Sequence, residues 1–202
     1  RSFSITVQND APSNHFNTII WDGNATSNRL IPGLSFQSDF VWVKQRTPNA
    51  TDHIIADSVR GGTGTGPNAT NLYLLYPYDT FAQATNVGTD FITSIENNGF
   101  KIGTSTYVNS TGSKYVAWCL KAGGAATTIA VNDRGNTIAS DVSVNNTLGF
   151  SIAKYTGNGS GGTVAHGLDA TVEMYIVKSM GSTAGWYTYH IGLDASSPED
   201  YN

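Results

Sequence analysis

The sequence contains one cysteine, two methionines and three glutamates among 202 residues, and charged residues make up only 13% of it. One cysteine cannot form a disulfide within the chain, so it leaves the cellular compartment open. The formal net charge is −4, and no run of Lys or Arg offers a local positive patch, which argues against nucleic acid as a partner. No stretch approaches the roughly 18 apolar residues of a membrane-spanning helix, so we expect no membrane insertion.

The residues that are abundant point to a β-protein. Glycine occurs 22 times, hydrophobic residues make up 39% of the chain, and Ser, Thr and Asn fill the segments between them. This composition is too apolar and aromatic for a disordered chain, and too poor in Leu, Glu, Lys and Ala for a helical one. The length fits one large all-β domain or two small ones. The chain begins at Arg1, so we expect it to be trimmed, processed or incomplete.

Short apolar and aromatic stretches follow one another, separated by Gly, Asn, Ser and Thr clusters. Several alternate with period two: Phe40, Trp42 and Lys44 fall on one side of a strand, and Val41 and Val43 on the other. No window carries a helical apolar stripe. The pattern predicts an all-β fold, an antiparallel β-sandwich of the jelly-roll or concanavalin-like kind. The expected strands are residues 2–8, 16–21, 39–45, 53–59, 71–76, 99–103, 114–121, 127–132, 149–155, 173–178 and 186–192.

One segment of the chain is repeated. Residues 16–46 align with residues 150–180 without a gap, and seven of the thirty-one positions are identical. The identities fall at turn and strand positions: Gly-Asn after an aromatic residue, then Gly-Leu, then Val-Lys. Because Gly and Asn tolerate positive φ, we expect Gly23-Asn24 and Gly157-Asn158 to close tight turns. The repeat predicts a duplicated hairpin unit, not a catalytic fingerprint.

The repeat suggests a domain organisation for the chain. The first copy would cover about residues 16–124 and the second residues 148–202, joined by the Gly/Ala/Thr-rich stretch "AGGAATT". Either the native polypeptide continues beyond Asn202, or both parts form one sandwich whose sheets each carry one copy. A half-unit alone would leave an open sheet edge and an uncovered apolar face. We therefore expect a single sandwich spanning residues 1–202.

The motifs that carry enzyme chemistry are missing from the sequence. The glycine-rich stretch "VRGGTGTGPNAT" lacks the Gly-Lys-Ser/Thr ending of a phosphate-binding loop. No G-x-S-x-G elbow occurs, and no strand carries the two carboxylates that glycoside hydrolysis requires. The loops "NDRGN" and "DASSPED" offer oxygen ligands for calcium, although solvated turns are the commoner outcome. We expect no catalytic residues, no metal site and no cofactor.

Aromatic residues supply the candidate contact site. Tyr76 and Tyr78 flank Pro77 in "LYLLYPYDTF", and Trp186 and Tyr187 begin the aromatic stretch "WYTYHIG". Exposed tyrosines among few charges suit stacking on sugar rings or a protein interface, although they can simply cover the end of a sandwich. Cys119, in "KYVAWCLK", is expected to be a buried and unreactive thiol.

Several segments in the same order resemble a known module: "LSFQSDFVWVKQR", "DHIIADSVRG", "NNGFKIGTSTYVNSTGSKYVAWCLKAGG" and "GFSIAKYTGNGSGGTVAHGL". They are similar to a module that recurs in structural proteins of tailed bacteriophages, especially aquatic ones. The aromatic "LYLLYPYDTF" and Leu120 depart from its usual pattern. The resemblance implies a lectin-like β-sandwich on the surface of the phage particle, in a capsid, tail or fibre, with no catalytic residues.

That resemblance also implies partners. We expect contacts with other virion proteins and a homo-oligomer, with a trimer favoured, because particle proteins act through symmetric contacts. The alternative is a carbohydrate-binding module that attaches a particle or cell to a host-surface glycan.

Overall fold

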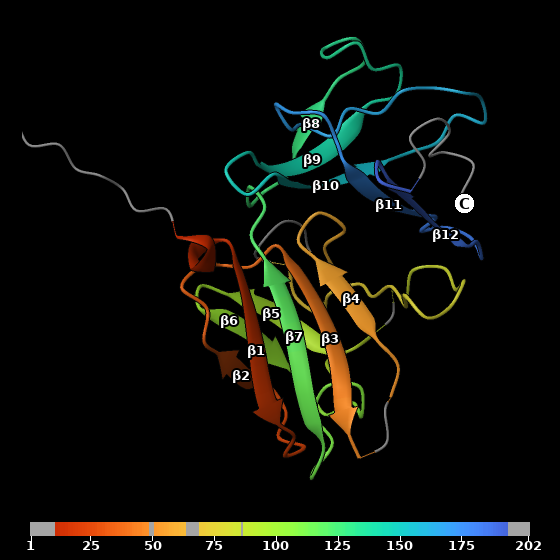
Figure 1. Ribbon diagram of the computed structural model, residues 1–202. Coiled ribbons are helices and arrows are strands. Elements are labelled where there is room, and N and C mark those ends of the chain that lie inside the picture. Colours follow the sequence, from red (N-terminus) through yellow and green to blue (C-terminus); the bar gives the residue numbers. More distant parts are fainter. Residues whose placement is uncertain (1–10, 49–50, 64–68, 86, 194–202) are drawn as a thin grey trace, which may run out of the picture.

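The computed structural model describes residues 11–48, 51–63, 69–85 and 87–193, so the strand expected at residues 2–8 lies outside the described part. These residues form a short 3-10 helix, Pro12–Asn14, and otherwise strands and loops (Figure 1). The all-β prediction is confirmed. The strands are β1 Phe16–Asp22, β2 Arg29–Pro32, β3 Phe40–Thr47, β4 Ile54–Asp57, β5 Ile92–Glu96, β6 Gly99–Ile102, β7 Lys114–Leu120, β8 Thr127–Ile129, β9 Ser140–Asn145, β10 Phe150–Tyr155, β11 Met174–Lys178 and β12 Trp186–His190.

Strands β1 to β7 form a two-layered sandwich. One sheet has the order β1-β7-β3-β4 and the other the order β2-β6-β5, and every pairing is antiparallel. Figure 1 shows the second sheet behind the first. The expected alternation in β3 is confirmed, because Val41 and Val43 are fully buried between the layers while Phe40, Trp42 and Lys44 are half-buried on the other face.

Trp21 anchors this core where the two layers meet. Its ring stacks on Tyr115 with centroids 5.4 Å apart and meets the edge of Phe100 at 5.7 Å. Its indole N–H donates to the carbonyl of Val108 at 2.9 Å. The Tyr115 hydroxyl donates to the Thr106 carbonyl and accepts from the Ser110 amide, both at 2.8 Å. These bonds satisfy the polar atoms of large buried rings, which would otherwise oppose burial.

The strands after residue 124 form two further sheets, β10-β9-β8 and β11-β12, gathered at one end of the sandwich (Figure 1). Phe150 of β10 contacts Phe40 of β3, with ring centroids 5.9 Å apart. Both layers of this sandwich come from strands in the first part of the chain. The expected organisation, one sandwich over residues 1–202 built from two related halves, stays a prediction. β7 pairs on both sides, with β1 and with β3, and so completes the first sheet without any described strand from the later part of the chain.

The repeated segments nevertheless share local geometry. β1 and β10 begin at aligned residues, and so do β3 and β11. The side chain of Asn24 accepts from the Thr26 amide at 3.0 Å, and that of Asn158 from the Ser160 amide at 2.9 Å. We expected positive φ at the Gly-Asn pairs. The structure places it instead on the residues that follow them, Ala25 (57°) and Gly159 (75°). The Asn side chain makes the turn, and the next residue absorbs the left-handed conformation. The duplication itself stays a prediction.

Three strands were not expected from the sequence, and one expected strand is reduced to single bridges. β2 ends in Pro32, β5 contains a bulge between Ile92 and Ser94, and β9 buries Ser140 and Ser143, so none shows regular apolar alternation. Residues 71–76 form isolated bridges, Leu74 with Ala84 and Leu75 with Ile55, and the amides of Asn71 and Leu72 donate to carbonyls of β5.

Cys119 lies in the core of the sandwich with no accessible surface, as predicted. Burial raises the pKa of its thiol to about 12, because the thiolate is poorly solvated there. We expect no reaction with a disulfide reagent at pH 8 in the folded protein and complete reaction once denaturant exposes the residue. Rapid labelling without denaturant would contradict the burial.

Candidate functional site

The first candidate surface is the tyrosine loop, residues 76–81, which follows the bridge at Leu75. Tyr76 packs against the core, and its ring lies 5.8 Å from Tyr78, 6.3 Å from Phe81 and 6.4 Å from Tyr107. The hydroxyls of Tyr78 and Tyr107 are 3.5 Å apart. Burial raises the pKa of Tyr76 and of Tyr78, and Tyr107 raises both further. Tyr78 and Phe81 remain 40% and 51% exposed, so the loop presents aromatic surface.

Trp186 holds this loop against β12. Its indole N–H lies 2.9 Å from the Asp79 carbonyl and 3.2 Å from the Tyr76 carbonyl, and Lys178 of β11 donates to the Thr80 carbonyl at 3.2 Å. The structure therefore brings together three of the predicted contact residues, Tyr76, Tyr78 and Trp186. Trp186 serves as a clamp, because its polar atom is already bonded.

Tyr187, the fourth predicted residue, lies on the opposite face of β12, since successive strand residues alternate. There it joins a second exposed surface, the tyrosine face, formed by Tyr175, Val177, Tyr187 and Tyr189. Tyr175 and Tyr189 are directly opposite each other in the hairpin and stack with centroids 4.8 Å apart at an interplanar angle of 7°. Tyr175 is 46% exposed and Tyr187 is 49% exposed. A rigid, stacked, amphipathic surface of this kind suits contact with a protein or a sugar ring.

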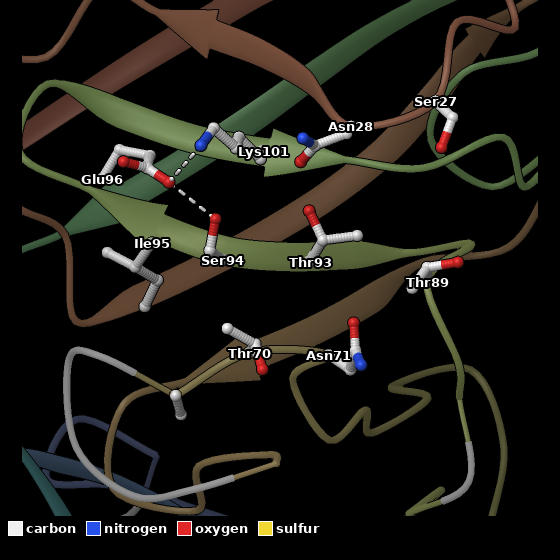
Figure 2. Close-up of a pocket in the computed structure, with 11 residues that line it drawn as sticks. Ser27, Asn28, Thr70, Asn71, Thr89, Thr93, Ser94, Ile95, Glu96 and Lys101 are labelled. Carbon is white, nitrogen blue, oxygen red and sulfur yellow. Dashed lines mark hydrogen bonds and ion pairs between the residues drawn. The ribbon is translucent and has the colours of Figure 1, made fainter.

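A hollow of about 540 Å³ lies on the outer side of the three-stranded sheet (Figure 2). We call it the polar hollow; the residues that matter here are Asn28, Asn71, Thr93, Ser94, Glu96 and Lys101. Figure 2 shows Ser94 and Lys101 on either side of the Glu96 carboxylate, which accepts from the Ser94 hydroxyl at 2.7 Å and from the Lys101 ammonium at 3.1 Å. The Ser94 hydrogen bond, with help from Lys101, holds the pKa of Glu96 below its usual range, so its charge is retained.

Two features suggest that the polar hollow is built to receive polar groups. Asn28 and Asn71 both line it with positive φ, 53° and 49°, a conformation that non-glycine residues rarely adopt outside turns and functional sites. The buried hydroxyl of Thr93 has no hydrogen-bond partner among the residues that the structure describes. Such a group costs free energy until a partner reaches it. None of the lining residues was singled out by sequence analysis, because polar loop residues are common in this chain.

The calcium alternative finds no support in the described loop. In "NDRGN", Asp133 accepts from the Ala130 amide at 3.0 Å, and Asn136 donates to the carbonyls of Ala130 and Ile138 at 3.1 and 2.8 Å. These are the bonds of a turn. The described residues contain no cluster of three or more acidic, His or Cys side chains that would hold a metal. "DASSPED" lies outside the described residues.

Residues 11–200 match a family described as a domain of unknown function, DUF7483. The chain belongs to this family. Comparisons with curated proteins and with solved structures find no match. The DUF7483 match covers the sandwich and the later strands alike, so the tyrosine face and the polar hollow both belong to the family domain. Within the described part of this DUF7483 chain, no helix is long and apolar enough to cross a membrane.

Tyr175 and Tyr189 were missed as site residues. The period-two alternation of "MYIVK" and "WYTYH" gives the face of its own strand on which each tyrosine lies. Placing both tyrosines on the same face of the hairpin also requires the register between the two strands, which the sequence does not give.

Proposed function

We propose that this DUF7483 domain is a non-enzymatic structural protein of a bacteriophage particle, decorating the capsid or forming part of a fibre or tail. It acts at the surface of the particle through contacts with other virion proteins and with copies of itself. The observation that carries the proposal is the tyrosine face, a stacked and exposed aromatic surface on a paired hairpin. The ordered resemblance of its segments to the phage module supports the same function.

A particle-binding experiment tests this function. Purified domain is mixed with phage particles from the same source that have been stripped of surface proteins, and the mixture is sedimented. We expect the domain to sediment with the particles at a fixed stoichiometry. A Tyr175→Ser, Tyr187→Ser variant is expected to bind at least about tenfold more weakly, because aromatic anchors dominate interface energies. Absence of binding by the unaltered domain would contradict the proposal.

The second candidate function is carbohydrate binding, and the polar hollow favours it. A carboxylate, an ammonium group and two amides converge on a concave surface, and each can pair with a sugar hydroxyl. Its volume of about 540 Å³ lies within the usual range of ligand pockets, about 300–1,000 Å³. We propose a neutral glycan as the ligand in this case.

A glycan array followed by calorimetry tests the second function. The Lys101→Ala variant is expected to weaken binding of any neutral glycan hit at least about tenfold, since it removes a charged hydrogen-bond donor. Lys114→Ala is the matched control. Lys114 forms an exposed ion pair with Asp22, and both residues lie on the four-stranded sheet, away from the polar hollow. Binding that is equally strong in all three proteins would place the site elsewhere, and an array without hits would contradict this function.

A further inference from the structure

The hairpin β11–β12 resembles the hairpin β3–β4, but among the described strands one neighbour of β3 has no equivalent beside β11. β3 pairs with β4 on one side and with β7 on the other. β11 occupies the aligned position in the repeat and pairs with β12 in nearly the same register: Phe40 lies opposite Asp57 in the first hairpin, and Met174 opposite His190 in the second. Among the described strands, nothing pairs with the other edge of β11.

The direction of the backbone groups identifies this free edge. The Ile191 amide donates to the Glu173 carbonyl at 2.8 Å, as the Ser58 amide donates to the Asp39 carbonyl at 2.9 Å. Because antiparallel strands alternate the direction of these groups, Met174, Ile176 and Lys178 direct theirs away from β12. The aligned residues of β3 are Phe40, Trp42 and Lys44, and each lies opposite a residue of β7.

The side chains of β11 are also more exposed than those of β3. Val41 and Val43 of β3 are fully buried, whereas Tyr175, which aligns with Val41, is 46% exposed. Ile176 is 49% exposed and Met174 is 52% exposed. A hollow of about 300 Å³ is lined both by Tyr155 at the end of β10 and by Met180 just after β11. β10 and β11 correspond to β1 and β3, the two strands that β7 separates in the sandwich.

We propose that β11 pairs with β11 of a second copy of this chain, antiparallel and about a two-fold axis at Ile176. This interface rests on the proposed structural function and gives it a partner and a geometry. We expect the free edge of β11 to pair, and not that of β12. In the sandwich, the strand that corresponds to β12 is β4, and β4 is the last strand of its sheet.

The strand is complementary to itself. With Ile176 opposite Ile176 of the second copy, Met174 lies opposite Lys178 and Tyr175 opposite Val177, so no two like charges meet. Lys178 is the only charged residue in Met174–Lys178, and the strand has no proline or bulge, the devices that usually prevent edge-to-edge pairing. The tyrosine faces of the two copies then form one continuous aromatic surface. A two-fold contact differs from the trimer favoured by the sequence, and the mass in solution distinguishes them.

Light scattering over a range of concentrations, with the intact chain, tests the interface. The unaltered protein is expected to be a dimer, and Ile176→Lys is expected to raise the dimer dissociation constant at least about tenfold, because two ammonium groups meet at the axis. Ile20→Lys is the matched control, since Ile20 is a 66% exposed isoleucine on the edge strand β1. It should leave the dimer intact.

A rescue experiment separates loss of the interface from loss of folding. Ile176→Lys and Ile176→Glu are each expected to be monomeric, and an equimolar mixture is expected to form a heterodimer. A monomeric or trimeric unaltered protein, or a dimer that Ile176→Lys does not weaken, would overturn the interface. The particle-sedimentation experiment has a separate readout, so dimer formation without particle binding would contradict the proposed function alone.

Discussion

Replacing Arg60 by alanine is expected to lower the free energy of unfolding by about 3–5 kcal/mol, because it leaves a buried carboxylate without its counter-charge. Arg60 forms an ion pair with Asp57 in which both side chains are 5% exposed. Its guanidinium also donates to the Ile55 carbonyl at 3.1 Å and, at 3.2 Å each, to the Tyr73 carbonyl and the Gln83 side chain. The residue thus ties β4 to both ends of the segment that carries the tyrosine loop.

Urea denaturation followed by tryptophan fluorescence measures this effect. Arg134→Ala is the control, since its ion pair with Asp169 is long, 3.5 Å, and both side chains are about half exposed or more. Exposed pairs contribute about 0–1 kcal/mol, so the control should unfold close to the unaltered protein. Equal effects of the two substitutions would show that the buried pair is not a main support of the fold.

Replacing Asp39 by alanine is expected to lower the free energy of unfolding by about 3 kcal/mol or more, because each buried donor left unpaired costs roughly 1–3 kcal/mol. Asp39 is 2% exposed, and its carboxylate accepts from the Ser58 hydroxyl at 2.8 Å and from the amides of Ala122 and Gly124 at 2.8 and 3.1 Å. The last two lie in the connection between the sandwich and the later sheets.

Hydrogen exchange gives this substitution a distinctive readout besides its stability. The amides of Ala122 and Gly124 should exchange much faster in Asp39→Ala, while those in the centre of β7 change only with global stability. Asp169→Ala, at a side chain that is 70% exposed, is the control and should alter neither. Unchanged protection at Ala122 and Gly124 would contradict the role assigned to the carboxylate.

The sequence was sufficient to predict the parts of the fold in which side-chain alternation is regular. The buried Val41 and Val43 follow from period two, and Cys119 from its apolar strand. β9 was missed because its buried Ser140 and Ser143 bond to backbone groups, which makes a polar stretch suitable for the interior. Such partners depend on tertiary contacts that no local pattern encodes.

The candidate site was predictable only in part, for the same reason. Tyr76 and Tyr78 were found from their neighbours in the chain, but the role of Trp186 depends on carbonyls more than one hundred residues away. The Tyr175–Tyr189 stack depends on a hairpin register that differs by one residue from that of β3–β4. The polar hollow is assembled from four separate segments of chain, so its residues carry no shared sequence signal.

The central position of β7 sets an order for folding during synthesis. β1 and β3 cannot pair with each other directly, because β7 lies between them, and β7 ends only at Leu120. A growing chain therefore holds β1 with an open edge until about one hundred further residues have emerged, and β3 until about seventy have emerged. Pairings of such long sequence separation form slowly. During that interval β1 and β3 are exposed to association with other nascent chains. Expression at low temperature, or with a chaperone that covers apolar strands, should raise the soluble yield more than any change to the folded surface.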